Sequence, residues 1–228
     1  MEKRNNQNKS IALLSILAGI AYLYLISIDF INHWDSNINS FRQGYDASAM
    51  ERTHEIDEEP FSLHLRAKDL KHYYSDSLMN LKNKQFMPAK YQHVEVLYQF
   101  SDYREYRSQA KYRLIIFGIV FLFLIALIAV PVYFYKIMGA FYKNNIFTHD
   151  NVRRMKMLGL LLLVIYLLDF LLDVTDYYYK NSLIETANYV ISVHISGVEW
   201  LFMGLITLLI AMILKRSVEI KEEQDLTI

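Results

Sequence analysis

One apolar run in the second half of the chain constrains the fold more than any other feature. From Met157 to Leu172 the only residues that are not aliphatic are Gly159, Tyr166, Asp169 and Phe170. Together with flanking residues, this run reaches the roughly 20 residues that a helix needs to cross a bilayer. The sequence therefore predicts a transmembrane helix within Asn145 to Asp176.

The residues before this run predict where the helix begins and which side of the membrane it starts from. The hydroxyl of Thr148 can cap the helix by accepting a hydrogen bond from a backbone N–H near Asn151, and Asp150 suits the positive end of the helix dipole. Arg153, Arg154 and Lys156 precede the apolar run, and carboxylates follow it. Under the positive-inside rule, the helix starts in the cytoplasm.

One stripe of this helix should face protein rather than lipid. Residues at helical spacing place a glycine and several carboxylates on the same face: Gly159, Leu162, Tyr166, Asp169, Asp173 and Asp176. A glycine lets a neighbouring helix approach closely, and a carboxylate inside the membrane is costly unless it has a partner.

Apolar blocks separated from charged blocks extend the membrane interpretation to the whole chain. Of the 228 residues 54% are hydrophobic, while the formal net charge is zero. Three further apolar runs, at 11–28, 114–135 and 198–214, have cations at the ends that we place inside. We expect an all-α polytopic membrane protein with four transmembrane helices and a small α+β extracytoplasmic insertion between helices one and two.

The expected organisation of the chain follows from these runs, with both termini cytoplasmic and the bacterial cytoplasmic (inner) membrane as the location. In order, we expect a cytoplasmic N-terminus and first transmembrane helix (1–28), an extracytoplasmic cap domain (29–113), the second transmembrane helix (114–135), a basic cytoplasmic loop (136–156), the third transmembrane helix (157–176), an extracytoplasmic loop (177–197), the fourth transmembrane helix (198–214) and a cytoplasmic tail (215–228). The first helix should pack through a stripe of small and polar residues: Ser15, Gly19, Tyr22, Ile26 and Asp29. The second helix, almost purely aliphatic and aromatic, should be the most exposed to lipid.

The extracytoplasmic segments carry weaker patterns. Alternating apolar residues predict two strands, one over Phe61 to Leu65 and one over Val94 to Tyr98. Apolar residues at helical spacing favour a helix over Leu70 to Lys84, and a short interfacial helix around Ser182 to Ile191.

Several kinds of chemistry have no support in the sequence. The chain has no cysteine, which excludes disulfides, thiolate zinc sites and a cysteine nucleophile. No Gly-rich phosphate loop, G-x-S-x-G elbow or H-E-x-x-H motif occurs, and His33, His54, His64, His72 and His93 are scattered without metal-site spacing. We expect no enzyme activity, no cofactor and no direct contact with nucleic acid.

Four polar residues near the outer ends of the third and fourth helices form a candidate cluster: Asp169, Asp173, His194 and Glu199. Two adjacent carboxylates in a low dielectric cannot both ionise cheaply, so one would hold a proton or bind a cation, with help from Asp29 or Arg113. The other interpretation is a structural polar cluster at the membrane interface. No two of these residues form a recognised ligand motif.

Two segments resemble a known family. Ile146-Phe147-Thr148, Asn151, Arg154 and Gly159 match the pattern "G-x-FT-x-x-N-x-x-R-L-x-x-x-G", with Asn145 in place of the glycine and Met155 in place of the leucine, and Glu222 to Ile228 (EEQDLTI) matches an "EEQDLTV"-like end. On these residues the chain resembles the bacterial four-helix membrane family catalogued as domain of unknown function 2975. The resemblance covers the last third of the chain well and the outer domain hardly at all. Family members lie beside a gene for a small helix-turn-helix regulator, which implies a transcription regulator as partner.

The tail and the neighbouring inner loop are the surface on which such a partner would bind. An acidic stretch that ends in apolar residues can dock a basic DNA-binding protein, although a charged tail is more often a solubilising helix end. The expected partner-binding residues are Thr148, Asn151, Arg153, Arg154, Glu222, Glu223, Gln224, Asp225, Leu226 and Ile228.

Two functional hypotheses follow. The first is a non-enzymatic integral membrane signalling or interaction protein that binds a small helix-turn-helix regulator. The alternative is a small ion- or proton-coupled transporter or immunity-type membrane protein that uses Asp169, Asp173, His194 and Glu199. Both place the chain in the lipid bilayer, and the small-residue stripes are compatible with packing within one chain or in a homo-oligomer.

Overall fold

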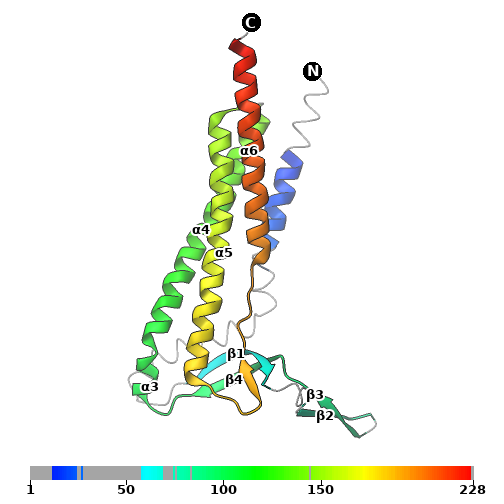
Figure 1. Cartoon of the computed structure of the whole chain (residues 1–228), viewed down its shortest axis with the longest axis vertical. Helices are drawn as coiled ribbons and strands as arrows, with labels where there is room; N and C mark the ends of the chain where they lie inside the picture. Colours follow the sequence, from blue (N-terminus) through cyan, green and yellow to red (C-terminus); the bar gives the residue numbers. More distant parts are fainter. Residues whose placement is uncertain are drawn as a thin grey trace. The chain divides into compact units, whose positions relative to one another are not determined.

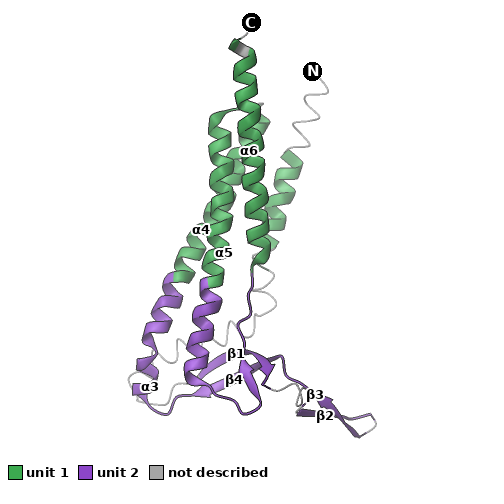
Figure 2. Ribbon diagram, viewed as in Figure 1, with its two compact units in different colours: residues 1–34, 119–170, 197–228 green, residues 35–118, 171–196 purple. Residues whose placement is uncertain are grey.

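The structure is a computed structural model that describes residues 12–24, 27, 58–68, 74, 76–82, 84–143 and 145–226. It divides into two compact units, which are coloured separately in Figure 2. We call residues 1–34, 119–170 and 197–228 the helical unit, and residues 35–118 and 171–196 the strand unit. The stripe residues Ile26 and Asp29 lie outside the described residues.

Helices dominate the described chain (Figure 1). They are the helix Ala12–Tyr24, α3 (Tyr103–Ser108), α4 (Ala110–Tyr142), α5 (His149–Leu183) and α6 (Val198–Leu226). Within the described residues, α4, α5 and α6 are long and apolar enough to cross a membrane, whereas the helix Ala12–Tyr24 is shorter. Three of the four predicted spans therefore have the required length and composition.

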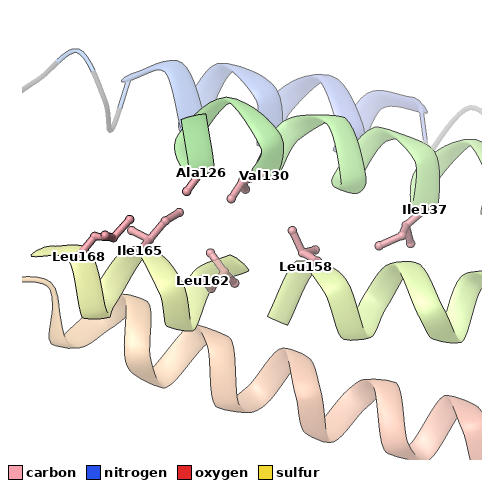
Figure 3. Packing of buried hydrophobic residues seen from close by; sticks show 7 residues of the cluster. All are labelled: Ala126, Val130, Ile137, Leu158, Leu162, Ile165 and Leu168. Atoms are coloured by element: carbon pink, nitrogen blue, oxygen red, sulfur yellow. The ribbon is translucent and has the colours of Figure 1, made fainter. Parts of the chain in front are cut away.

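The core of the helical unit lies between α4 and α5 (Figure 3). It consists of aliphatic side chains spaced three, four or seven residues apart along each helix: Ala126, Val130 and Ile137 from α4, and Leu158, Leu162, Ile165 and Leu168 from α5. Few residues outside this core are buried. In the most apolar window of each helix, the buried share is 11% for α4, 28% for α5 and 17% for α6. Of the three, α4 has the least buried apolar window, which agrees with the expectation that it is the most exposed to lipid.

Glycines allow the close helix contacts of this unit. A Cβ atom added at Gly159 would lie 2.8 Å from Cγ of Leu208, and one at Gly204 would lie 2.8 Å from Cδ2 of Leu163. Helices α5 and α6 therefore meet at two positions where only a glycine fits without rearrangement. The predicted stripe on the helix Ala12–Tyr24 also makes contact, because Gly19 lies against the Tyr135 side chain and Tyr22 donates a 2.6 Å hydrogen bond to the carbonyl of Leu127.

The strand unit contains two small antiparallel sheets. The first has the order β4-β1-β5, from β1 (Glu58–Ala67), β4 (His93–Gln99) and β5 (Tyr189–Ile191), and the second pairs β2 (Asp76–Asn80) with β3 (Gln85–Ala89). The two strands predicted from alternation are confirmed as β1 and β4, and Phe61 stands opposite Val96 in the register. The buried core of the first sheet is Phe61, Leu63, Tyr179 and Ile191.

Two predicted helices are wrong in the described residues. Asp76 to Asn80 lies within the helix expected over Leu70 to Lys84 but forms β2, and Lys84 at φ 56° belongs to the turn into β3. The helix expected around Ser182 to Ile191 is replaced by the end of α5 at Leu183 and by β5. In both places, pairing with another strand decided the conformation, and local periodicity does not record such pairing.

Candidate functional site

The amino end of α5 begins after Thr148, as the sequence predicts. The polar side chains there hydrogen-bond mainly to the backbone of the preceding loop. The hydroxyl of Thr148 accepts a 3.4 Å hydrogen bond from the backbone N–H of Asn151. The Asn151 side chain is 1% exposed, and its amide donates to the carbonyls of Asn145 and Ile146. Thr148 and Asn151 thus order the turn before the helix, and Asn151 is too buried to contact a partner protein.

A cationic hollow lies between α4 and the first turns of α5. It consists of two adjoining cavities of about 380 and 430 Å³ that share Lys136, Asp150 and Arg154. Arg153 and Tyr133 line the first cavity. Arg154 is held in place because its guanidinium donates to the carbonyl of Lys136 at 3.3 Å and to the Asn151 side chain at 3.4 Å.

The carboxyl end of α6 reaches the amino end of α5. The helix continues from the apolar span to Leu226, and Nε2 of His149 lies 2.9 Å from a carboxylate oxygen of Glu222. Earlier in the tail, Glu219 lies 3.6 Å from both Lys215 and Arg216. The structure therefore brings the predicted tail residue Glu222 to the predicted loop, through a histidine that the sequence analysis did not single out.

The rest of the predicted tail is only partly described. Glu223 and Gln224 are exposed, and the Leu226 side chain is 86% exposed. The Asp225 side chain and Ile228 lie outside the described residues. The exposed end of α6 therefore combines carboxylates with one large apolar side chain.

In the helical unit, Asp169 lies against Gly197, the residue before α6. Gly197 has a φ of +69°, and a Cβ atom there would overlap the Asp169 carboxylate. Its carbonyl accepts a 2.9 Å hydrogen bond from the N–H of Trp200, in the first turn of α6. Glu199 is exposed in the same turn, where the helix dipole favours a negative charge.

In the strand unit, Asp173 has a different local partner. Its carboxylate accepts hydrogen bonds from the backbone N–H of Ser196 at 2.8 Å and from the Ser196 hydroxyl at 2.9 Å. One turn further along α5, Lys180 pairs with Asp176 and donates a 2.7 Å hydrogen bond to the carbonyl of Ser62 in β1. These contacts connect α5 to the loop before α6 and to the sheet.

Three histidines far apart in the sequence meet in the strand unit. The ring of His64 in β1 stacks on His194 with centroids 4.4 Å apart, and its centroid lies 4.8 Å from that of His93 in β4. His64 and His194 line a cavity of about 130 Å³ together with Asp173 and Lys180. Burial lowers the pKa of His64 below its usual value, and the nearby His194, His93 and Lys180 lower it further, while Asp173 opposes them. By their spacing, His64 and His93 are scattered in the sequence and His194 falls in another predicted cluster. Pairing of β1 with β4 sets His64 opposite His93, which spacing alone does not record.

Arg113 was expected to assist the carboxylate cluster, but in the strand unit it contacts a different set of side chains. Its guanidinium lies 3.5 Å from the Glu59 carboxylate and 3.3 Å from the hydroxyl of Tyr179, and it stacks on the ring of Tyr106 at 3.6 Å. Tyr179 also donates a 2.6 Å hydrogen bond to Glu59. Arg113 thus ties the start of α4 to β1 and α5.

The four members of the predicted polar cluster divide between the two units. Asp169 and Glu199 belong to the helical unit, whereas Asp173 and His194 belong to the strand unit. Across the described residues, no three histidine, aspartate or glutamate side chains form a group that could hold a metal ion. Asp173 accepts hydrogen bonds from Ser196 and Asp169 lies against Gly197, so each carboxylate lies beside the loop that leads into α6.

Comparison with known proteins identifies one family. The family model described as "Protein of unknown function (DUF2975)" matches residues 99–228, which is more than half of the chain. No curated protein and no solved structure matches the chain. The match includes α4, α5 and α6, and with them the cationic hollow and the tail.

Proposed function

Because the chain belongs to the DUF2975 family, whose function is unknown, we propose its function from its own surfaces: it is a non-enzymatic membrane protein that docks a small basic regulator on the end of α6. The observation that carries this proposal is the contact between His149 and Glu222, which joins the tail to the first residue of α5. A tail held in this way presents a defined surface, whereas a solubilising helix end needs no such contact.

The proposed orientation places this surface in the cytoplasm. The segment before the apolar part of α5, which includes the first turns of that helix, carries Lys143, Arg153, Arg154 and Lys156. Lys215 and Arg216 follow the apolar part of α6. An excess of lysine and arginine beside apolar helices marks the cytoplasmic side. With this orientation, residues 29–113 and 177–197 would be extracytoplasmic, and the membrane would be the bacterial inner membrane.

The chemistry of the tail indicates the class of partner. Beyond Lys221, the carboxylates of Glu222, Glu223 and Asp225 precede the exposed Leu226. Small DNA-binding regulators carry a basic surface for phosphates, and an acidic, partly apolar helix end is complementary to it. A helix-turn-helix regulator held there would be kept away from DNA until a change in the membrane protein released it.

The ion-coupled alternative has less support. Asp173 accepts two hydrogen bonds from Ser196, and Asp169 lies against Gly197, so both carboxylates already have local structural roles. A transporter would need at least one of them to exchange protons or cations. Replacing Asp169 with asparagine separates the two hypotheses, because docking on α6 does not use this carboxylate.

The test is affinity purification of the full chain from its native membranes in mild detergent, beside a chain that ends at Lys221 and a full chain with Asp169→Asn. We expect a small basic DNA-binding protein with the full chain and with Asp169→Asn, and none with the truncated chain. The truncated chain should keep its helix content by circular dichroism. Capture of the same regulator by the truncated chain would overturn the assignment to the tail.

A further inference from the structure

The cationic hollow between α4 and α5 is not used by the proposed docking surface. Four positive side chains line it, namely Lys136, Lys143, Arg153 and Arg154, against the single carboxylate of Asp150. Within the described residues, none of these four cations forms an ion pair. An excess of positive charge that the protein itself does not neutralise indicates an anionic ligand.

The geometry of the hollow suits a phosphate group. Each of its two cavities, about 380 and 430 Å³, falls within the roughly 300–1,000 Å³ that small ligands occupy. Arg154 lines both cavities, and a guanidinium is a planar donor set that matches phosphate oxygens. The amino end of α5, a helix of 35 residues, adds a favourable dipole at the same place.

The apolar surroundings indicate that the phosphate is carried by a lipid. Met157 and Tyr133 line the smaller cavity beside the cations. Next to them, the exposed apolar surface of α4 and α5 begins, with Val132 47% and Leu160 39% exposed. A free phosphate would gain nothing from these side chains, whereas the acyl chains of a phospholipid would cover them.

We propose that the hollow binds the phosphate of an anionic phospholipid headgroup, with Lys136, Lys143 and Arg154 as its main contacts. Basic pockets between membrane helices are suited to such headgroups, since each cation near the membrane surface contributes to binding. The acyl chains lie along the exposed faces of α4 and α5. This proposal does not depend on the regulator or on the tail.

The test is native mass spectrometry of the full chain in mild detergent, titrated with phosphatidylglycerol and separately with phosphatidylcholine. The variant is Lys136→Gln with Lys143→Gln, and the matched control is Lys215→Gln with Arg216→Gln, which removes the same charge from α6 outside the hollow. We expect phosphatidylglycerol to bind the first double variant about tenfold or more weakly than the unchanged chain, and the control within about twofold. Equal thermal melting of the two double variants checks that both fold.

Two results would overturn the proposal. One is equal binding of phosphatidylglycerol and phosphatidylcholine, and the other is equal loss of phosphatidylglycerol binding in both double variants. A third arm adds inorganic phosphate as competitor at the same concentrations. Persistence of lipid binding in that arm supports the lipid source, and displacement by phosphate overturns it in favour of a soluble phosphate ligand.

Discussion

The helical unit and the strand unit are stabilised in different ways. The helical unit packs aliphatic side chains along α4 and α5, and Asn151 is the one buried polar residue among those described. The strand unit packs the rings of Phe61 and Tyr179 with Leu63 and Ile191 in its core, and hydrogen bonds such as that from Tyr179 to Glu59 connect its elements. Close helix packing therefore dominates one unit, and specific polar and aromatic contacts dominate the other.

This difference has a physical reason. In lipid, apolar side chains gain little by leaving their surroundings, so helices associate through close packing at small residues. In water, burial of apolar surface drives folding, and each buried polar group needs a hydrogen-bond partner. Substitutions should therefore destabilise the two units for different reasons. The following predictions run from the largest expected effect to the smallest.

Replacing Phe61 with alanine should have the largest effect. Phe61 is 3% exposed and its ring contacts Tyr179 edge to face at 5.4 Å, so we expect a loss of about 3–5 kcal/mol in the stability of the strand unit. Hydrogen exchange followed by mass spectrometry should show faster exchange in β1, β4 and β5. The matched control is Leu97→Ala in β4, because Leu97 is 53% exposed. Equal exchange in both variants would contradict the assigned core.

Replacing Gly159 with leucine tests close packing in the helical unit. A side chain there must displace Leu208, and overpacking of this kind costs about 1–3 kcal/mol. We expect a lower melting temperature in detergent and faster exchange in α6. Gly118→Leu in α4 is the control, since a Cβ atom there meets nothing within 4 Å. Similar melting of the two variants would argue against the tight contact between α5 and α6.

Replacing Gly197 with alanine tests the connection into α6. Its φ of +69° costs about 1–2 kcal/mol for a residue with a Cβ atom, and the new methyl group would also push away the Asp169 carboxylate. The first turn of α6 should exchange faster, with little change in the sheet. Gly139→Ala in α4 should leave exchange unchanged or slower, because that position is open and helical. No change for Gly197→Ala would exclude strain at this residue.

Lowering the pH should decrease the stability of the strand unit, and this is the smallest of the four expected effects. The pKa of His64 lies below its usual value in the folded chain, so below about pH 6.5 the unfolded chain binds more protons than the folded one. Stability contributed by neutral His64 is therefore fully present above this pH and decreases as the pH falls toward the lowered pKa. The amide of Ser192, whose N–H donates a 2.8 Å hydrogen bond to the carbonyl of His64, should therefore lose protection in that range, once its exchange rate is corrected for the intrinsic pH dependence of amide exchange.

His64→Asn is the variant that tests this origin of the pH dependence. It keeps the backbone bond to Ser192 and removes the titrating ring, so the protection of the Ser192 amide, corrected for intrinsic exchange, should depend less on pH between 5 and 7. Glu105 offers a contrast in the same unit, because hydrogen bonds from Ser101 and Tyr98 lower its pKa and its contribution is lost only at more acidic pH. An unchanged pH profile in His64→Asn would exclude the histidine stack as its cause.

The sequence by itself determined the features that repeat along a helix or a strand. Apolar runs predicted α4, α5 and α6, Thr148 predicted the start of α5, and the stripe through Gly159 predicted a face that packs on protein. The alternation around Phe61 and Val96 predicted two strands that do pair. These signals are local, since each depends on residues within two or three turns of one element.

The tertiary structure alone decided which distant residues meet. It made a strand of Tyr189–Ile191, stacked His64 on His194, joined His149 to Glu222 and turned Asp169 toward Gly197. It also made Asn151 a buried support of its loop, where the sequence had indicated a contact for a partner. Such contacts depend on pairing between segments far apart in the chain, and the periodicity of one segment contains no information about the segment that will lie against it.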